Sequence, residues 1–149
     1  MAKVSGAAKG RRTQWATQFL ATAELVRRGY TVSFTMGNST PIADLMVGAP
    51  SGEQFWVDVK GLSVKSDWLV SPKALHKNLF YVLVYLSPLA QSGTERRPDQ
   101  FYVLTQQEAN DLEQAYRDAR PGNKTTMKGF RFGSAEPHRD CWDKLPAAE

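Results

Sequence analysis

The feature that most constrains this chain is an uninterrupted apolar run of eight residues, Leu79 to Leu86. Such a run is far shorter than the roughly 20 residues that a membrane-spanning helix needs. It is typical of a strand that lies inside a sheet and is buried on both faces. We therefore expect a central strand here, within a sheet that is flanked by helices.

The length and composition favour one ordinary domain. The chain has 149 residues, of which 42% are hydrophobic and 23% charged, a mixture that excludes an intrinsically disordered protein. We predict a flexible basic N-terminus over residues 1–10 and a single domain over residues 11–149. The single cysteine, Cys141, allows no disulfide within the chain. Because the first residues also lack the apolar core of a signal peptide, we expect a cytoplasmic protein that is not inserted in a membrane.

Positive charge is concentrated at the start of the chain. The net charge is +4, and residues 1–30 carry six basic side chains against a single acidic one. A basic segment attracts the phosphate backbone of a nucleic acid. The alternative is a solvated basic tail without a partner. The candidate nucleic-acid-binding residues are Lys9, Arg11, Arg12 and, after the central motif, Lys73.

A helix is expected to follow this basic opening, from Arg12 to Arg28, with Gly29 as its stop signal. Its apolar residues recur at helical spacing, which predicts that one stripe faces the core. The stripe consists of Trp15, Phe19, Thr22 and Val26.

Three short strands are predicted next, over residues 30–36, 42–47 and 54–60, with turn residues at 37–41 and a hairpin connection at 48–52. After a less regular segment, in which Ser71-Pro72 would start a short helix, comes the central strand. A fifth strand is expected over residues 101–104. Thr105 would then cap a helix that runs to about Arg117, with Glu108 completing a capping box. This order predicts an α/β or α+β fold with a mixed sheet.

The residues that carry the chemistry lie on two of these strands. Asp58 and Lys60 are two positions apart, so they share one face of their strand. If the hairpin pairs this strand with the preceding one, Asp44 approaches Asp58. Neighbouring carboxylates repel each other unless a cation lies between them, and their hard oxygens suit Mg²⁺ or Mn²⁺. The Lys60 ammonium could orient an attacking water or stabilise charge on a phosphate.

The arrangement of Ala43-Asp44, a hairpin and then Asp58-Val59-Lys60-Gly61 resembles the PD-(D/E)xK nuclease superfamily, and within it the Holliday-junction-resolvase-like branch. The resemblance covers residues 9–61 well, and the tail is similar to small uncharacterised bacterial and phage members. It implies a restriction-endonuclease-like fold and a metal-dependent DNA endonuclease. Members that act on branched DNA are commonly dimers, so a homodimer is also implied.

The resemblance assigns a role to each matching residue. Asp44, Asp58 and the carbonyl of Val59 would bind the metal, and Lys60 would be the motif lysine. Many members place a Glu on the first helix, where this chain has Gln18, and some use Gln there. We therefore count Gln18 among the catalytic candidates, as a group that supports a metal-bound water.

Two alternatives remain open from the sequence. The charged residues could be the solvated polar face of an amphipathic hairpin. The fold could also serve as a nucleic-acid- or protein-binding module whose catalytic site has decayed, because Gln18 replaces an acid and Ala43 replaces the proline of the motif. Trp56 shares the face of Asp58 and could stack on a base, or it could pack under the first helix.

Overall fold

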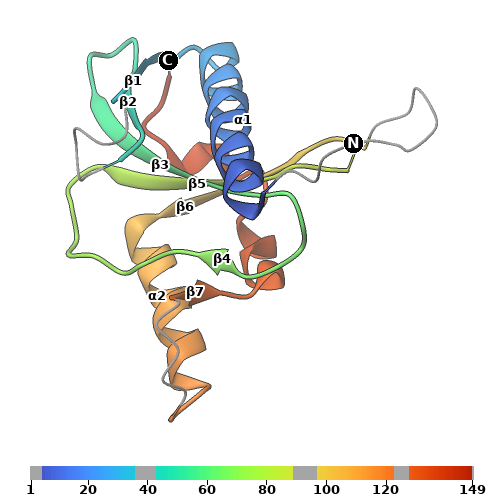
Figure 1. Ribbon diagram of the computed structural model, residues 1–149. Helices are drawn as coiled ribbons and strands as arrows, with labels where there is room; N and C mark the ends of the chain where they lie inside the picture. The colour runs from blue at the N-terminus through green and yellow to red at the C-terminus, as the bar shows by residue number, and fades with distance from the viewer. Residues whose placement is uncertain (1–4, 36–42, 89–96, 123–127, 149) are drawn as a thin grey trace.

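The computed structural model describes residues 5–35, 43–88, 97–122 and 128–148. In chain order the helices and strands are α1 (Gly6–Arg27), β1 (Thr31–Phe34), β2 (Leu45–Gly48), β3 (Gln54–Leu62), β4 (Trp68–Leu69), β5 (Leu79–Tyr85), β6 (Gln100–Thr105), α2 (Gln106–Asp118) and β7 (Gly129–Phe130), followed by the short 3₁₀ segments η1 (Phe132–His138) and η2 (Trp142–Lys144) (Figure 1).

A mixed sheet forms the centre of the fold, with the strand order β1-β2-β3-β5-β6. Strands β1, β2 and β3 form an antiparallel meander, β3 and β5 are parallel, and β5 and β6 are antiparallel. β5 lies between two partners and all but one of its residues are buried, as the apolar run predicts. The predicted α+β fold with a mixed sheet flanked by helices is confirmed.

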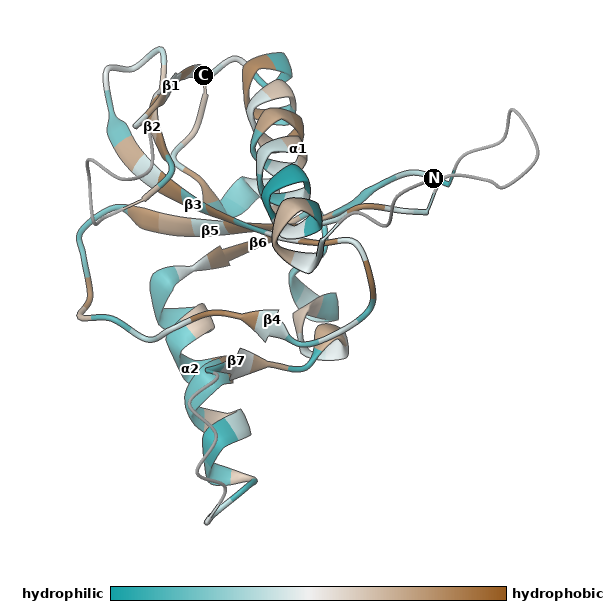
Figure 2. Cartoon of the chain, viewed as in Figure 1, coloured by the Kyte–Doolittle hydropathy of each residue, from teal (hydrophilic) through white to brown (hydrophobic). Residues whose placement is uncertain are grey.

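The sheet separates two apolar layers, and its central strands are rich in hydrophobic residues (Figure 2). On one face α1 and η2 cover Val57 and Val59 of β3. On the other face the small β4-β7 sheet, α2 and η1 cover the opposite side of β5. Each layer buries alternate residues of the same strands, because successive side chains of a strand point to opposite faces.

Helix α1 corrects two predictions. It begins at Gly6, with the Ser5 side chain capping the N–H of Ala8, so residues 6–10 of the predicted flexible terminus are helical; residues 1–4 lie outside the described part of the chain. The predicted apolar stripe is also largely wrong. Trp15, Phe19 and Val26 are 49%, 57% and 54% exposed, respectively. The buried face consists of Thr17, Gln18, Ala21 and Leu25.

A close approach between α1 and β3 explains this rotation of the helix. A Cβ atom at Gly61 would lie 2.4 Å from the Thr17 Oγ1 atom, so only glycine leaves room for the helix here. Small residues such as Thr17 and Ala21 let the helix backbone come near the sheet, whereas an aromatic stripe would hold it away. The aromatic side chains stay outside, where Phe19 contacts Trp15 and Phe34 of β1.

The other predicted elements lie close to their predicted bounds, apart from one short helix, whereas β4, β7 and the two 3₁₀ segments were not predicted. Thr105 and Glu108 form the predicted capping box, and α1 ends before Gly29, whose φ is +101°. The segment after Ser71 contains no helix and runs as an irregular connector to β5. The predicted turn at 37–41 lies outside the described residues. Within the described ranges, no helix is both long and apolar enough to cross a bilayer.

Candidate functional site

The hairpin places Asp44 and Asp58 side by side. The last ladder pair between β2 and β3 joins Leu45 to Val57, and the next step of the same register joins Asp44 to Asp58. The backbone of Asp44 is fixed because its carbonyl accepts a hydrogen bond from the Thr35 N–H at 3.0 Å. The predicted approach of the two carboxyls is therefore present.

The backbone orientation of β3 brings these side chains especially close. The Trp56 N–H donates to the Asn78 carbonyl, on the side of β5. Asp58 lies two residues later, so its backbone N–H and C=O also point towards β5. It is therefore at a non-hydrogen-bonded position of the β2-β3 pair. In antiparallel pairs the side chains approach each other most closely at such positions.

Val59 has the opposite orientation. Its N–H donates to the Asp44 Oδ2 atom at 2.8 Å. The N–H and C=O of one strand residue point to the same neighbouring strand. The Val59 carbonyl is therefore directed towards the side of Asp44, beyond the end of the β2 ladder.

The surroundings of Asp44 disfavour its ionised form. Burial and then the adjacent Asp58 carboxyl raise the pKa of Asp44 to about 7, against the opposing effects of the Val59 N–H and Lys60. A carboxyl in this position either retains a proton or requires a nearby cation. The two acids thus form a site where positive charge is favourable.

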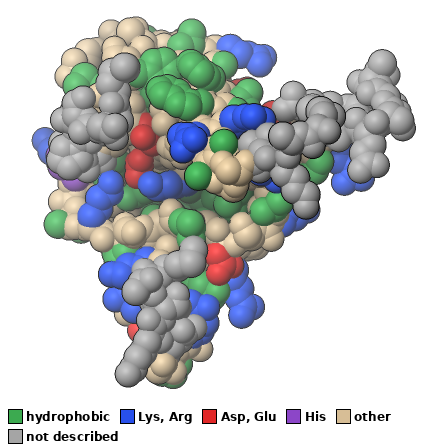
Figure 3. Space-filling view, viewed as in Figure 1, with side chains coloured by type: hydrophobic (Ala, Val, Ile, Leu, Met, Phe, Trp, Pro, Cys, Tyr) green, Lys and Arg blue, Asp and Glu red, His purple; other side chains and the backbone are tan. Residues whose placement is uncertain are grey.

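Two lysine ammonium groups contact the buried carboxylate of Asp58. The Nζ atom of Lys60 lies 3.3 Å from Asp58 Oδ2, and the Nζ atom of Lys73 lies 3.6 Å from the same oxygen. Lys60 therefore shares the face of Asp58, as predicted. Lys73 was predicted only as a backbone-binding residue, and the structure brings it into the acid site. Figure 3 shows acidic side chains on the face in view, bordered by basic ones.

Tyr81 of β5 also belongs to this neighbourhood, although no sequence pattern marks it apart from its place in the apolar run. It is paired with Asp58 in the β3-β5 register and is fully buried. Its hydroxyl finds no hydrogen-bond partner among the described residues. Burial, followed by the negative charge of Asp58, raises the pKa of this phenol.

Gln18 is not joined to the acids. Gln18 is buried on α1, which packs on the face of β3 that carries Val57 and Val59. The Asp58 side chain points to the other face of β3. Between the described residues no hydrogen bond links Gln18 to Asp44 or Asp58. Glu24, the one acidic residue of α1, forms ion pairs with Arg27 and Arg28.

The other predicted residues are placed as follows. Lys9, Arg11 and Arg12 are exposed on the first turns of α1, whose first turn carries no acidic residue. Trp56 is half-buried and packs with the Tyr81 layer, on the face away from α1, so the prediction that it packs under the first helix is wrong.

The chemistry of the donor set suits a hard divalent cation. Asp44 and Asp58 supply carboxylate oxygens, and the Val59 carbonyl adds a third oxygen donor on the same side. Mg²⁺ is commonly bound by one or two carboxylates, with water and substrate phosphate as its other ligands. In the described ranges no three His, Cys, Asp or Glu side chains cluster together, so a cage made of side chains alone is not formed.

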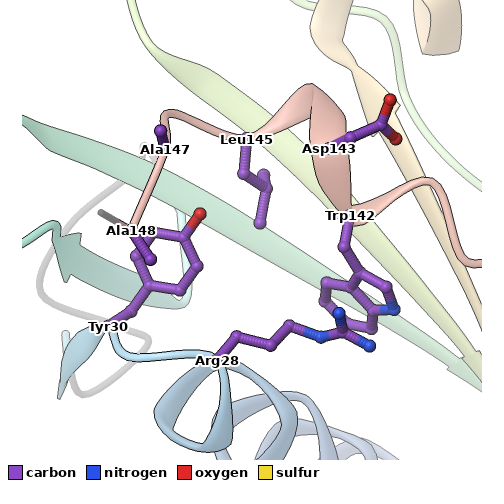
Figure 4. A pocket seen from close by; sticks show the side chains of 7 residues that line it. All are labelled: Arg28, Tyr30, Trp142, Asp143, Leu145, Ala147 and Ala148. Atoms are coloured by element: carbon purple, nitrogen blue, oxygen red, sulfur yellow. The ribbon is translucent and has the colours of Figure 1, made fainter.

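A separate pocket lies where the chain end covers the last turn of α1 (Figure 4). The Arg28 guanidinium stacks 4.4 Å from the centre of the Trp142 ring, and the Tyr30 hydroxyl donates to the Pro146 carbonyl at 2.5 Å. Neither acid of the β2-β3 hairpin lines this pocket. Its contacts attach the C-terminal segment to the body of the domain.

No protein-family model, curated protein or solved structure matches this chain significantly.

Proposed function

We propose that this protein is a Mg²⁺- or Mn²⁺-dependent DNA endonuclease that hydrolyses phosphodiester bonds, with branched or structured DNA as a candidate substrate. The observation that supports this proposal most directly is the juxtaposition of Asp44 with Asp58 and of Lys60 with Asp58 on one face of the hairpin. The resemblance to PD-(D/E)xK nucleases rests on these same residues.

Each residue has a distinct task in the proposed reaction. Asp44, Asp58 and the Val59 carbonyl would hold the metal, which supplies activation of water and neutralisation of phosphate charge. Lys60 orients the water for in-line attack on phosphorus. The new bond joins the water oxygen to phosphorus, and the water releases one proton to solvent. The bond to the leaving oxygen breaks, and that oxygen takes a proton from solvent. The protein itself contributes position and charge.

The first turns of α1 would grip the DNA backbone. Lys9, Arg11 and Arg12 lie in the first two turns of α1, and the first turn has no acidic residue that would neutralise them. Exposed cations of this kind attract a phosphate backbone. The same residues would make affinity for DNA depend strongly on salt.

Cleavage of supercoiled plasmid, four-way junction and single-stranded DNA tests the proposal. We expect cleavage with Mg²⁺ or Mn²⁺, none with EDTA, and loss of cleavage in Lys60→Ala with DNA affinity largely retained. The matched control is Lys65→Ala, a neighbouring lysine on the same segment whose ammonium lies over the Tyr85 ring instead. Intact DNA of all three kinds with the wild-type protein refutes the proposal.

A second candidate is a binding module with this fold and no catalysis. It is favoured by the ion pairs of Lys60 and Lys73 with Asp58, which neutralise that carboxylate without a metal, and by the separation of Gln18 from the acids. Calorimetry with Mn²⁺ distinguishes the two functions. An endonuclease shows a binding heat that Asp44→Asn abolishes, whereas the binding module shows none in either protein.

A further inference from the structure

The connector between β4 and β5 carries Lys73 into the acid site by a specific set of contacts. The ammonium of Lys73 reaches Asp58 Oδ2 at 3.6 Å and also lies 5.8 Å from the centre of the Tyr81 ring. Its side chain is 36% exposed, so a ligand in solvent can reach it. Lys60, at 3.3 Å from the same oxygen, has a similar exposure of 34%.

We propose that Lys73 is a second catalytic lysine, which binds the scissile phosphate together with Lys60, and that Gln106 of α2 is the residue that positions it. This inference rests on the proposed endonuclease function and extends it to residues beyond the PD-(D/E)xK motif.

Gln106 holds the connector by its backbone. Its Nε2 atom donates to the carbonyls of Lys73 and Ala74, at 3.2 and 3.0 Å, and its Oε1 atom accepts from the His76 N–H at 2.6 Å. Asn110, one helical turn later, donates to the Lys73 carbonyl at 3.3 Å. Because Gln106 is only 3% exposed, these bonds are shielded from water. The backbone at Lys73 is thus fixed although the segment has no regular secondary structure.

The position of Lys73 is informative because its ammonium contacts an oxygen of Asp58, which is also a proposed metal ligand. Lys60 and Lys73 both approach Asp58 Oδ2, so both ammonium groups compete with a divalent cation for this carboxylate. When a divalent cation binds the Asp58 carboxylate, the Lys73 ammonium remains next to that cation. The DNA phosphate can then replace Asp58 as the anionic partner of Lys73. A cation fixed beside the phosphate stabilises the additional charge of the transition state.

Single-turnover cleavage at saturating protein, combined with Mn²⁺ calorimetry without DNA, tests the inference. We expect Lys73→Ala to lower the cleavage rate constant by about 100-fold and Lys73→Arg to lower it less. Lys73→Ala should bind Mn²⁺ about tenfold more tightly, because a repelling charge is removed from Asp58. The control Lys77→Ala, an exposed lysine of the same connector, should change neither quantity.

Gln106→Met, which preserves volume but removes the hydrogen bonds, tests the positioning role. It should slow cleavage in the wild-type background and have no further effect in the Lys73→Ala background. Additive losses would show a merely structural role and overturn that part of the inference.

A Lys73→Ala protein that cleaves as fast as Lys77→Ala, or that binds Mn²⁺ no more tightly than the wild type, overturns the role of Lys73 while the endonuclease function stands. A wild-type protein that cleaves no DNA refutes the endonuclease function, and the catalytic role of Lys73 with it.

Discussion

Replacing Asp44 with asparagine should stabilise the metal-free protein at neutral and alkaline pH. The substitution removes the negative charge, and the asparagine side-chain oxygen can still accept the hydrogen bond from the Val59 N–H. It therefore separates the cost of a carboxylate at this position from the contribution of the hydrogen bond. Most substitutions of a partly buried polar residue destabilise a protein, so stabilisation would be an informative result.

The magnitude follows from the pKa of Asp44, which is raised from 3.8 to about 7. At 1.36 kcal/mol per pKa unit, this shift corresponds to a destabilisation of roughly 4 kcal/mol by the ionised carboxylate. We reduce this value to about 2 kcal/mol because the side chain is partly exposed. Below pH 3.8 both states of the protein are protonated and the effect vanishes. Between pH 4 and 7 the unfolded chain loses this proton first, so the unfolding free energy falls as pH rises.

Thermal unfolding from pH 5 to 8 in EDTA measures the effect. At pH 8 we expect the melting temperature of Asp44→Asn to exceed that of the wild type by about 4–8 °C, and we expect the difference to shrink towards pH 5. Saturating Mn²⁺ should reverse the order, since a ligand at 100 times its Kd stabilises the wild type by about 2.7 kcal/mol. A mutant that is less stable at pH 8 in EDTA, or a difference that does not change with pH, refutes the reasoning.

Three further predictions concern packing and charge. Gly61→Ala should lower the unfolding free energy by about 1–3 kcal/mol in urea denaturation, because its Cβ would meet Thr17, and Thr17→Ala should recover part of this loss. Tyr81→Phe should be neutral or stabilising by about 1 kcal/mol in the same assay, since it removes a buried hydroxyl without a partner among the described residues; a clear loss would contradict this. Replacing the α1 triad Lys9, Arg11 and Arg12 with alanine should reduce the slope of log affinity for double-stranded DNA against log salt by about 2–3, whereas Arg27→Ala, at the opposite end of α1, should leave it nearly unchanged.

The site residues on the hairpin could be predicted because their geometry is local. Alternation along β3 fixes which residues share a face with Asp58, and a short connection fixes the register with β2. These two rules place Asp44 opposite Asp58 and put Lys60 beside it. The central strand was predictable for a similar reason, since only a strand with neighbours on both sides and covered faces tolerates an apolar run of this length.

Lys73 and Tyr81 could not be assigned to the site in this way. Lys73 reaches Asp58 through a connector without regular secondary structure, and its place depends on hydrogen bonds from Gln106, which lies 33 residues later in the chain. No periodicity encodes such a contact. Tyr81 stands in an apolar run, where a tyrosine is indistinguishable from core until the register with β3 is known.

The orientation of α1 shows why helix residues were assigned less well than strand residues. A sequence pattern ranks helix faces by hydrophobicity, and on that measure the Trp15 and Phe19 stripe should be buried. In the structure the buried face of α1 is instead the one with small residues, because Thr17 packs directly against Gly61. The same orientation of α1 buries Gln18 between the helix and the sheet, on the face of β3 that α1 covers. The Asp58 side chain lies on the other face of β3. The position of Gln18 on the helix therefore does not bring it to the acids, and the catalytic proposal rests on the hairpin and its connector instead.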